Sequence, residues 1–286
     1  MANLKEIRNR ISSVTSTMKI TSAMKMVSAA KLKKAQDAIT AMRPYSEKLT
    51  DLMSNFSEII SSSSISYLSE TRDVKNVLVV SICSNKGLCG AFNSNVIKQS
   101  LSLKNEEEFK GANFSYLTIG KKANDILSKT ENIISNHSNV YDNLVYDEVA
   151  NVSEKIVEEF NLGNFDKVLI VFNSFKNAAN QIVKTEQFLP IESMDETNKT
   201  GDYIFEPSME QIVSELVPKS LKIQLFKAIR DSFAGEHGAR MTAMHKATDN
   251  ATELRDELKL TYNKARQAAI TNEILEIVSG AEALNG

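Results

Sequence analysis

The chain has 286 residues, a formal net charge of −2, 42% hydrophobic residues and 24% charged residues, a composition typical of a folded soluble protein. Two cysteines, Cys83 and Cys89, are too few for a disulfide scaffold and favour a reducing compartment. No run of about 18 apolar residues would span a bilayer. The N-terminus lacks the hydrophobic core of a signal peptide, so a secreted or membrane-inserted product is not expected.

Positive charge is concentrated at the N-terminus. Residues 1–50 hold ten Lys and Arg against three Asp and Glu, a net charge of +7 that leaves −9 for the rest of the chain. A basic segment on an acidic body indicates a negatively charged partner, or a solvated face that keeps a helix soluble. Charge alone does not decide between the two.

The first predicted element is a long helix. Residues 3–58 contain no glycine and one proline, Pro44. Five apolar residues recur at alternating intervals of three and four, which predicts a coiled-coil seam; they are Leu4, Ile7, Ile11, Val14 and Met18. Beyond them we expect the seam to drift, as at a stutter, through Ile20, Met24, Val27, Ala30, Leu32 and Ala35.

The central part of the chain predicts strands that alternate with helices. Continuous apolar runs at 76–82, 113–119 and 167–175 are typical of strands buried on both faces. Helices are expected at 91–101, 121–129 and 147–160, and the alternating segment 181–191 predicts an antiparallel edge strand. This order predicts a mostly parallel, Rossmann-like sheet with helices on its faces.

A second long helical stretch covers residues 208–279. Ser208 is placed to cap it, and we expect Pro218 to end one helix and begin another. Gly235 and Gly238 predict a kink or a close approach of another backbone. An apolar stripe is formed by Leu221, Leu225, Ile229 and Phe233. A coiled-coil seam with alternating intervals of four and three is predicted at Ala247, Ala251, Leu254, Leu258, Thr261, Ala265, Ala268, Asn272 and Leu275.

The last turns of this stretch are apolar nearly all round, more than one coiled-coil partner can cover, so further protein is expected to enclose them. The fold class predicted is therefore α/β, with the terminal helices paired as an antiparallel coiled coil. The expected division is a coiled-coil helix at 1–60, an α/β domain at 74–190, a linker at 191–207 and a second coiled-coil helix at 208–286.

The best candidate for a chemical site is the turn SNKGLCGAFN at 84–93. Its glycines could cradle a phosphate at a helix N-terminus, but it has neither the GxxxxGK[ST] nor the GxGxxG spacing, and Lys86 precedes the first glycine. His237 and His245 lack the acidic pattern of a metal site. Glu236 and Arg240 are spaced as an i,i+4 ion pair, which would stabilise the helix only slightly if it is exposed. We predict no catalytic, cofactor-binding or metal-binding residue.

Four segments together resemble the γ subunit of F-type ATP synthases, in its bacterial form. ITNEILEIVSGAEA at 270–283 resembles the C-terminal signature of that family, and GEHGARMTAMHKATDNA at 235–251 resembles the block before it. IRNRISSVTSTMKITSAMKMVSAAKLKKAQ at 7–36 resembles its opening helix. SNKGLCG stands where the family has SDRGLCG, with Asn85 and Lys86 as mild departures.

The resemblance implies a central rotor shaft of the F1 sector, which couples ion-driven rotation of a membrane ring to conformational cycling of catalytic β subunits. It implies that the chain is not an enzyme on its own, holds no cofactor and acts at the cytoplasmic face of the bacterial inner membrane. The implied partners are the α and β subunits, the ε subunit and the c-ring. Expected contacts with the α/β ring are Lys25, Lys31, Lys33, Arg266, Gln267, Ile270, Thr271, Glu273, Ile274 and Ile277.

Two other functions compete with the rotor hypothesis. A nucleotide-binding α/β enzyme with accessory coiled-coil arms would bind ATP through the Lys86 loop. A basic coiled-coil protein that binds nucleic acid would show salt-dependent binding, although the acidic remainder of the chain and the lack of a recognisable binding module argue against it.

Overall fold

The computed structural model describes residues 4–55, 66–70, 72–178, 180–191, 206 and 208–285. These residues belong to two compact units. One unit spans Ser28–Arg240 and contains the α/β domain, and the other combines Met1–Val27 with Met241–Gly286. Most of the linker expected at 191–207 lies outside the described residues.

The α/β domain is built on one five-stranded sheet. Its strands are β1 (Asn76–Ile82), β2 (Asn113–Ile119), β3 (Asn132–Asn136), β4 (Lys167–Phe175) and β5 (Gln181–Leu189), in the order β3-β2-β1-β4-β5. All neighbouring strands are parallel except β4 and β5, which are antiparallel. The predicted mostly parallel sheet with an antiparallel edge strand is confirmed, whereas β3 was not predicted.

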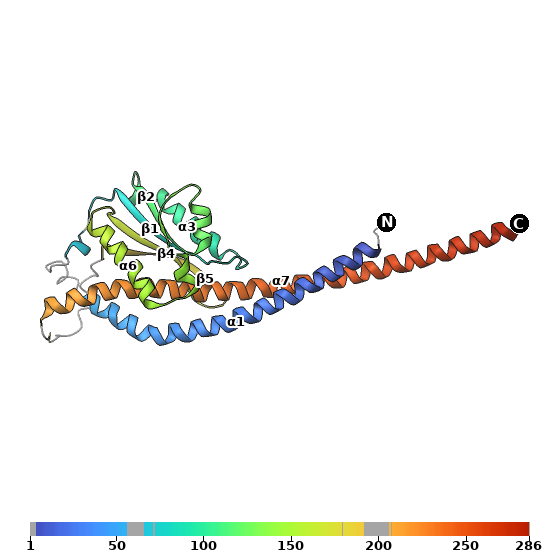
Figure 1. Ribbon diagram of the computed structural model, residues 1–286, viewed down its shortest axis with the longest axis horizontal. Coiled ribbons are helices and arrows are strands. Elements are labelled where there is room, and N and C mark those ends of the chain that lie inside the picture. Colours follow the sequence, from blue (N-terminus) through green and yellow to red (C-terminus); the bar gives the residue numbers. More distant parts are fainter. Residues whose placement is uncertain are drawn as a thin grey trace. The chain divides into compact units, whose positions relative to one another are not determined.

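Helices cover both faces of the sheet (Figure 1). On one face α3 (Phe92–Ser102) and α4 (Lys121–Leu127) enclose a cluster of buried side chains that includes Val79 of β1 and Val171 of β4. On the other face a larger cluster joins the alternate residues of these strands to α6 (Tyr146–Asn161) and α7 (Met209–Asn285). The short elements are η1 (Ser66–Leu68), η2 (Leu103–Asn105), η3 (Glu107–Phe109) and α5 (Ser138–Asp142).

The expectation that Pro218 ends one helix and begins another is wrong. A single helix, α7, runs from Met209 to Asn285 without a break. A proline inside a helix costs about 3 kcal/mol. Around it Val213, Val217 and Leu221 are buried in the core, and each such side chain stabilises the fold by about 1.5–3 kcal/mol. Packing therefore outweighs the proline. The predicted cap is confirmed, since the Gln211 amide donates to Ser208 Oγ at 3.3 Å.

The coiled-coil unit pairs the first part of α1 (Leu4–Asn55) with the last part of α7 in antiparallel order. Arg8 Nη2 donates to the Tyr262 hydroxyl at 2.8 Å, and Thr21 lies opposite Thr248. From the first pair to the second the position in α1 moves forward, from Arg8 to Thr21, while the position in α7 moves back, from Tyr262 to Thr248. The two helices therefore run in opposite directions. The predicted α1 seam residues between Leu4 and Met18 are all buried or half-buried, as expected.

Both seams depart from the predicted pattern further along. In α1 the 3-4 spacing continues without a stutter through buried Thr21, Ser28, Leu32, Ala35 and Ile39, and the expected Ile20, Val27 and Ala30 are exposed. In α7 the seam runs through Met244, Thr248, Ala251, Arg255, Leu258, Tyr262 and Ala265, all buried or half-buried. The expected Ala247 is also half-buried, whereas the expected Leu254, Thr261, Ala268, Asn272 and Leu275 are exposed. Two causes account for the difference. Polar side chains such as Thr21, Thr248 and Arg255 occupy covered positions, and beyond Ala265 every described side chain of α7 is exposed.

Candidate functional site

The C-terminal end of α7 is a helix that no other described part of the chain covers. From residue 266 to residue 283 every side chain is exposed. The apolar ones include Ile270 at 48% and Ile277 at 66% exposure. At 1.5 Å per residue this stretch is roughly 27 Å long. An apolar surface of this extent marks a site of interaction with other protein.

The structure places the predicted ring contacts in two groups. Lys25 is half-buried and belongs to the coiled-coil unit, as do the seven residues predicted between Arg266 and Ile277, all of which are exposed. Lys31 and Lys33 are exposed on the part of α1 that belongs to the α/β unit. Lys31 acts electrostatically on Glu236 within its own unit: burial raises the pKa of Glu236, and the positive charge of Lys31 is one of the smaller effects that oppose this rise.

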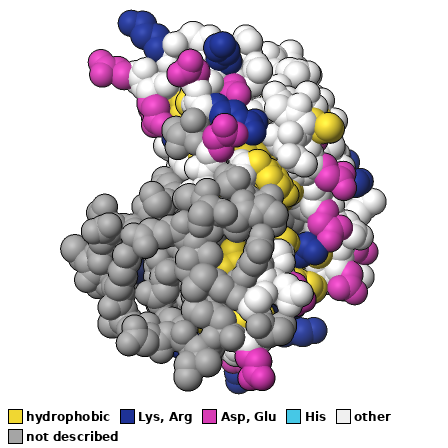
Figure 2. All heavy atoms as spheres, turned by 90° about the vertical axis from the view of Figure 1, so that its left-hand side faces the viewer, with side chains coloured by type: hydrophobic (Ala, Val, Ile, Leu, Met, Phe, Trp, Pro, Cys, Tyr) yellow, Lys and Arg dark blue, Asp and Glu magenta, His cyan; other side chains and the backbone are white. Residues whose placement is uncertain are grey.

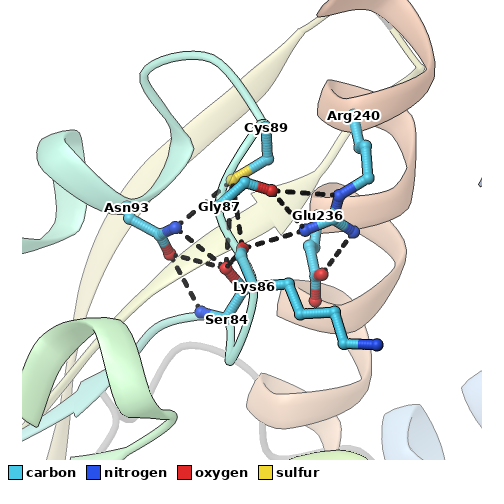
Figure 3. A network of polar contacts seen from close by, with 7 residues as sticks. All are labelled: Ser84, Lys86, Gly87, Cys89, Asn93, Glu236 and Arg240. Atoms are coloured by element: carbon cyan, nitrogen blue, oxygen red, sulfur yellow. Dashed lines mark hydrogen bonds and ion pairs between the residues drawn. The ribbon is translucent and has the colours of Figure 1, made fainter. Parts of the chain in front are cut away.

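A second feature is a polar cluster between α7 and the loop that follows β1 (Figure 3). Arg240 Nη2 donates to the carbonyl oxygens of Lys86 at 3.0 Å and Gly87 at 3.1 Å, and Nε donates to the Gly87 carbonyl at 3.3 Å. The third nitrogen of the guanidinium, Nη1, is paired with the Glu236 carboxylate. We call Arg240, Glu236 and these two carbonyl groups the Arg240 clamp.

Burial changes the character of this ion pair. The sequence suggested an exposed pair worth a few tenths of a kcal/mol, but the Arg240 and Glu236 side chains are only 8% and 6% exposed. Burial raises the pKa of Glu236 above its ordinary value, and the opposing effect of the Arg240 charge is smaller. A buried pair of this kind is weak evidence for stability but can specify a single arrangement.

The loop side of the clamp is braced by its own hydrogen bonds (Figure 3). The Ser84 amide donates to Asn93 Oδ1 at 2.9 Å, and Ser84 Oγ donates to the Lys86 carbonyl at 2.6 Å. Asn93 Nδ2 lies 3.2 Å from Cys89 Sγ. Within this braced loop Leu88 has φ of +62° and is 65% exposed. A left-handed leucine is strained, and such strain persists only where the surroundings hold it.

The geometry of the loop does not favour phosphate binding. Phosphate sites present backbone N–H groups, whereas here two loop carbonyl oxygens point at Arg240. The Lys86 side chain is exposed, and its ammonium group lies at the outer edge of the cluster (Figure 3). The bonds seen in the loop are those of a structural turn, so the nucleotide-binding alternative gains no support from it.

The two cysteines are buried free thiols. Burial raises the pKa of Cys83 well above its ordinary value and also raises the pKa of Cys89, where a hydrogen bond from Ser84 acts in the opposite direction. A thiol is nucleophilic only as a thiolate. Neither cysteine is therefore suited to catalysis at neutral pH.

His237 is a buried core side chain. Its ring packs edge to face against Phe233 at 4.5 Å, and within the described part of the chain neither ring nitrogen has a hydrogen-bond partner. Burial, together with the charges of Arg240 and Lys31, lowers its pKa to about 4. Among the described residues, no three or more His, Cys, Asp or Glu side chains lie together in a way that could hold a metal ion.

Charge on the face in Figure 2 is mixed. Acidic and basic side chains are interspersed on the described part of that face and are not gathered by sign. Nucleic-acid interfaces gather Lys and Arg on one surface. This face therefore gives no support to the nucleic-acid hypothesis.

Comparison with known proteins decides among these hypotheses. A family model described as ATP synthase matches residues 3–284. An ATP synthase gamma chain of Flavobacterium psychrophilum is 64% identical, and one of a Geobacter species is 41% identical, each alignment covering all of both chains. The chain belongs to the ATP synthase gamma chain family. The predicted resemblance is confirmed.

The fold agrees with that of a chain in a solved ATP synthase structure. A chain in the mitochondrial ATP synthase of Euglena gracilis matches with a TM-score of 0.70 and 21% identity, covering 98% of this chain and 94% of that one. At this identity the likeness speaks for the fold alone. As a gamma chain, this protein is a component of an ATP synthase. None of its described helices is long and apolar enough to cross a membrane.

Sequence reasoning located some of these features and missed others. The exposed apolar end of α7 was predicted from the sequence. The clamp was not, because Arg240 and Gly87 are 153 positions apart and the pair looked like an ordinary surface pair. The signal that could have found it is Arg240 within a helix that also carries Gly235 and Gly238, since two glycines in a helix interior indicate close packing.

Proposed function

We propose that this chain is the non-catalytic rotating shaft of the F1 sector and that it acts by presenting different faces to the catalytic subunits as it turns. The observation that carries the proposal is the uncovered apolar end of α7, where Ile270, Ile274 and Ile277 are all about half exposed or more. A shaft end must be enclosed by a surrounding ring to remain folded and soluble. This requirement matches a sleeve formed by α and β subunits.

Side chains near this end would make the contacts with the ring. The apolar Ile270, Ile274 and Ile277 would turn against the inner wall of the sleeve, and polar residues beside them would meet its rim; these are Arg266, Gln267, Thr271 and Glu273. All seven are exposed, which leaves them available for such contacts.

The basic part of α1 would meet acidic loops of the β subunits. Lys33 is exposed and Lys25 half-buried, so both can reach a partner. Lys31 is exposed as well, although its charge also acts on Glu236. Exposed charges act over a distance of about 8–10 Å at physiological salt, so we expect these lysines to influence rate and direction more than the strength of assembly.

The α/β domain, expected at 74–190, would serve as the foot that meets the ε subunit and the membrane c-ring. The rotor would then be peripheral to the membrane at its cytoplasmic face, held there through the complex. Ion flow would turn the ring and the foot, and the asymmetric coiled coil would drive the catalytic β subunits through different nucleotide affinities.

Charged substitutions at the end of α7 test this proposal. Ile274→Asp and Ile277→Asp should weaken co-assembly of this chain with α and β subunits, because enclosing an unpaired carboxylate carries a desolvation cost of several kcal/mol. The thermal unfolding of the α/β domain should not change. Glu276→Asp, an exposed position in the same turns, is the matched control. Full assembly of both aspartate variants would contradict the enclosed shaft end.

A further inference from the structure

Two attachments fasten α7 to the α/β domain within six residues, at Gly235–Arg240. Both lie at the C-terminal limit of the α/β unit, which ends at Arg240. Beyond this residue α7 belongs to the coiled-coil unit. The two attachments are therefore the last contacts of the helix within the α/β unit.

The first attachment is a close approach of backbones. A Cβ atom added at Gly238 would lie 3.2 Å from both the Cα and the carbonyl oxygen of Ala178, in the connection between β4 and β5. One added at Gly235 would lie 3.3 Å from side-chain atoms of Phe92 and Gln181. The helix thus lies against α3 and the β4–β5 connection without intervening side chains of its own. This close approach explains the two helical glycines.

The second attachment is the Arg240 clamp. Its donors point in two directions: Nε and Nη2 point to the loop carbonyls, and Nη1 points to Glu236 one turn earlier on α7. A guanidinium is planar, so fixing one nitrogen fixes the direction of the other two. Glu236 is therefore placed to orient Arg240, and Arg240 is placed to hold the loop (Figure 3).

The clamped loop is continuous with the centre of the sheet. Ser84 follows β1 almost directly, and β1 lies in the middle of the strand order. Ser84 Oγ donates to the same Lys86 carbonyl that accepts from Arg240. Asn93 of α3 then accepts from the Ser84 amide. A displacement of α7 at Arg240 would therefore be passed by hydrogen bonds to β1 and α3.

We propose that the Arg240 clamp, with the glycine contact beside it, is the linkage that makes α7 turn together with the sheet at the C-terminal limit of the α/β unit, beyond the part of α7 that is packed in the core. Arg240 and Glu236 are positioning residues for torque transfer, since neither touches a nucleotide or an ion. This inference rests on the proposed rotor function. It makes one specific claim: opening the clamp weakens the coupling between ATP hydrolysis and ion transport, even in a complex that assembles.

The test uses the full complex, reconstituted in vesicles with this chain or its variants. Arg240→Gln removes the charge and the fork, whereas Arg240→Lys keeps the charge but cannot hold two carbonyls and a carboxylate with fixed geometry. The ratio of ion transport to ATP hydrolysis should fall by about threefold or more with glutamine and by less with lysine. Lys219→Gln, from the exposed pair with Glu215 on the same helix, should leave the ratio unchanged.

Hydrogen exchange measured on the same variants in the full chain reports the clamp directly. Arg240→Gln should speed exchange of the Ser84 amide and its loop by about tenfold or more, while the amides of β2 stay protected. Unchanged loop exchange would show that the clamp does not hold the loop. Faster loop exchange with an unchanged transport ratio would overturn the linkage. A wild-type chain that assembles but supports no ATP-driven transport would instead count against the rotor function itself.

Discussion

Thr21 and Thr248 face each other across the coiled coil with their Oγ1 atoms 2.8 Å apart. The Thr248 hydroxyl also donates to the Met244 carbonyl of its own helix at 2.7 Å. Thr21 has the same choice, since its hydroxyl lies 3.1 Å from the Met18 carbonyl of α1. A hydroxyl has one proton to donate, so the threonine that donates across the seam gives up the bond to its own helix, and its partner accepts. A polar pair at a seam position favours one register of a coiled coil, because sliding would break the bond between the two hydroxyls and leave each with only the carbonyl of its own helix.

Removing one hydroxyl should cost more than removing both. Thr21→Val should lower the local free energy of opening by about 0.5–1.5 kcal/mol, since a hydrogen bond is lost across the seam. Adding Thr248→Val should recover part of this loss, because two apolar side chains then meet. Hydrogen exchange of amides in residues 10–27 measures the effect in the full chain. Strictly additive losses would show that the two hydroxyls do not act as a pair.

Stability should fall on acidification because of His237. Its pKa is lowered to about 4 in the folded protein, whereas an unfolded histidine titrates near 6.5. Between about pH 6.5 and 4 His237 binds a proton in the unfolded chain but not in the folded chain. The free energy of unfolding therefore decreases as pH falls through this window, by up to about 1.4 kcal/mol per pH unit. The raised pKa of Glu236 acts in the opposite direction, since the folded state then binds a proton more readily.

His237→Phe separates the two effects. The phenyl ring keeps the contact with Phe233 and removes the two nitrogens that have no partner among the described residues. The difference in unfolding free energy between this variant and wild type should be flat above about pH 6.5 and should grow in favour of the variant below it. Urea titrations at a series of pH values provide the measurement. A difference that does not depend on pH would mean that His237 binds its proton equally in both states.

The strained Leu88 predicts a gain in stability on mutation to glycine. Its φ of +62° is open to glycine without strain but costs a residue with a Cβ atom about 1–2 kcal/mol. Leu88→Ala is the matched control, because alanine keeps the Cβ atom and removes the same exposed apolar surface. Leu88→Gly should therefore unfold at a higher urea concentration than Leu88→Ala. Equal midpoints would place the loop under no strain at this residue.

Elements with a strong local pattern were predictable from the sequence. Strands β1, β2 and β4 have the predicted bounds, because runs such as NVLVVSI are apolar, β-branched and bounded by polar residues. Strand β3 was missed because Asn132–Asn136 is short and half exposed at the edge of the sheet. This strand forms because it pairs with β2, a long-range contact that its local composition does not predict.

Features that depend on long-range contacts were not predictable. The seam of α7 includes Arg255 and Tyr262, which the sequence marks as surface residues. Each finds a partner on α1: Arg255 Nη1 lies 3.4 Å from Met18 Sδ, and Tyr262 accepts from Arg8. Only the paired helix makes these positions favourable. For the same reason Arg240 makes its hydrogen bonds to the loop carbonyls only when the loop after β1 is folded against α7.

The close contact at Gly238 predicts a loss of stability where helix propensity predicts a gain. Replacing glycine by alanine inside a helix is worth about 1 kcal/mol. The new Cβ atom, however, would lie 3.2 Å from backbone atoms of Ala178, which cannot rotate away. Overpacking costs about 1–3 kcal/mol, so Gly238→Ala should lower the free energy of unfolding of the α/β domain.

Two further glycines serve as controls for Gly238→Ala. Gly235→Ala should be milder, because its nearest neighbours are side-chain atoms of Gln181 and Phe92 that can adjust. Gly280→Ala has open space around the new atom and should increase helicity at the end of α7. Urea unfolding of the domain and circular dichroism of the full chain measure the two effects. A Gly238→Ala domain as stable as wild type would mean that the β4–β5 connection yields to α7, and the junction would then be too soft to transmit torque at this point.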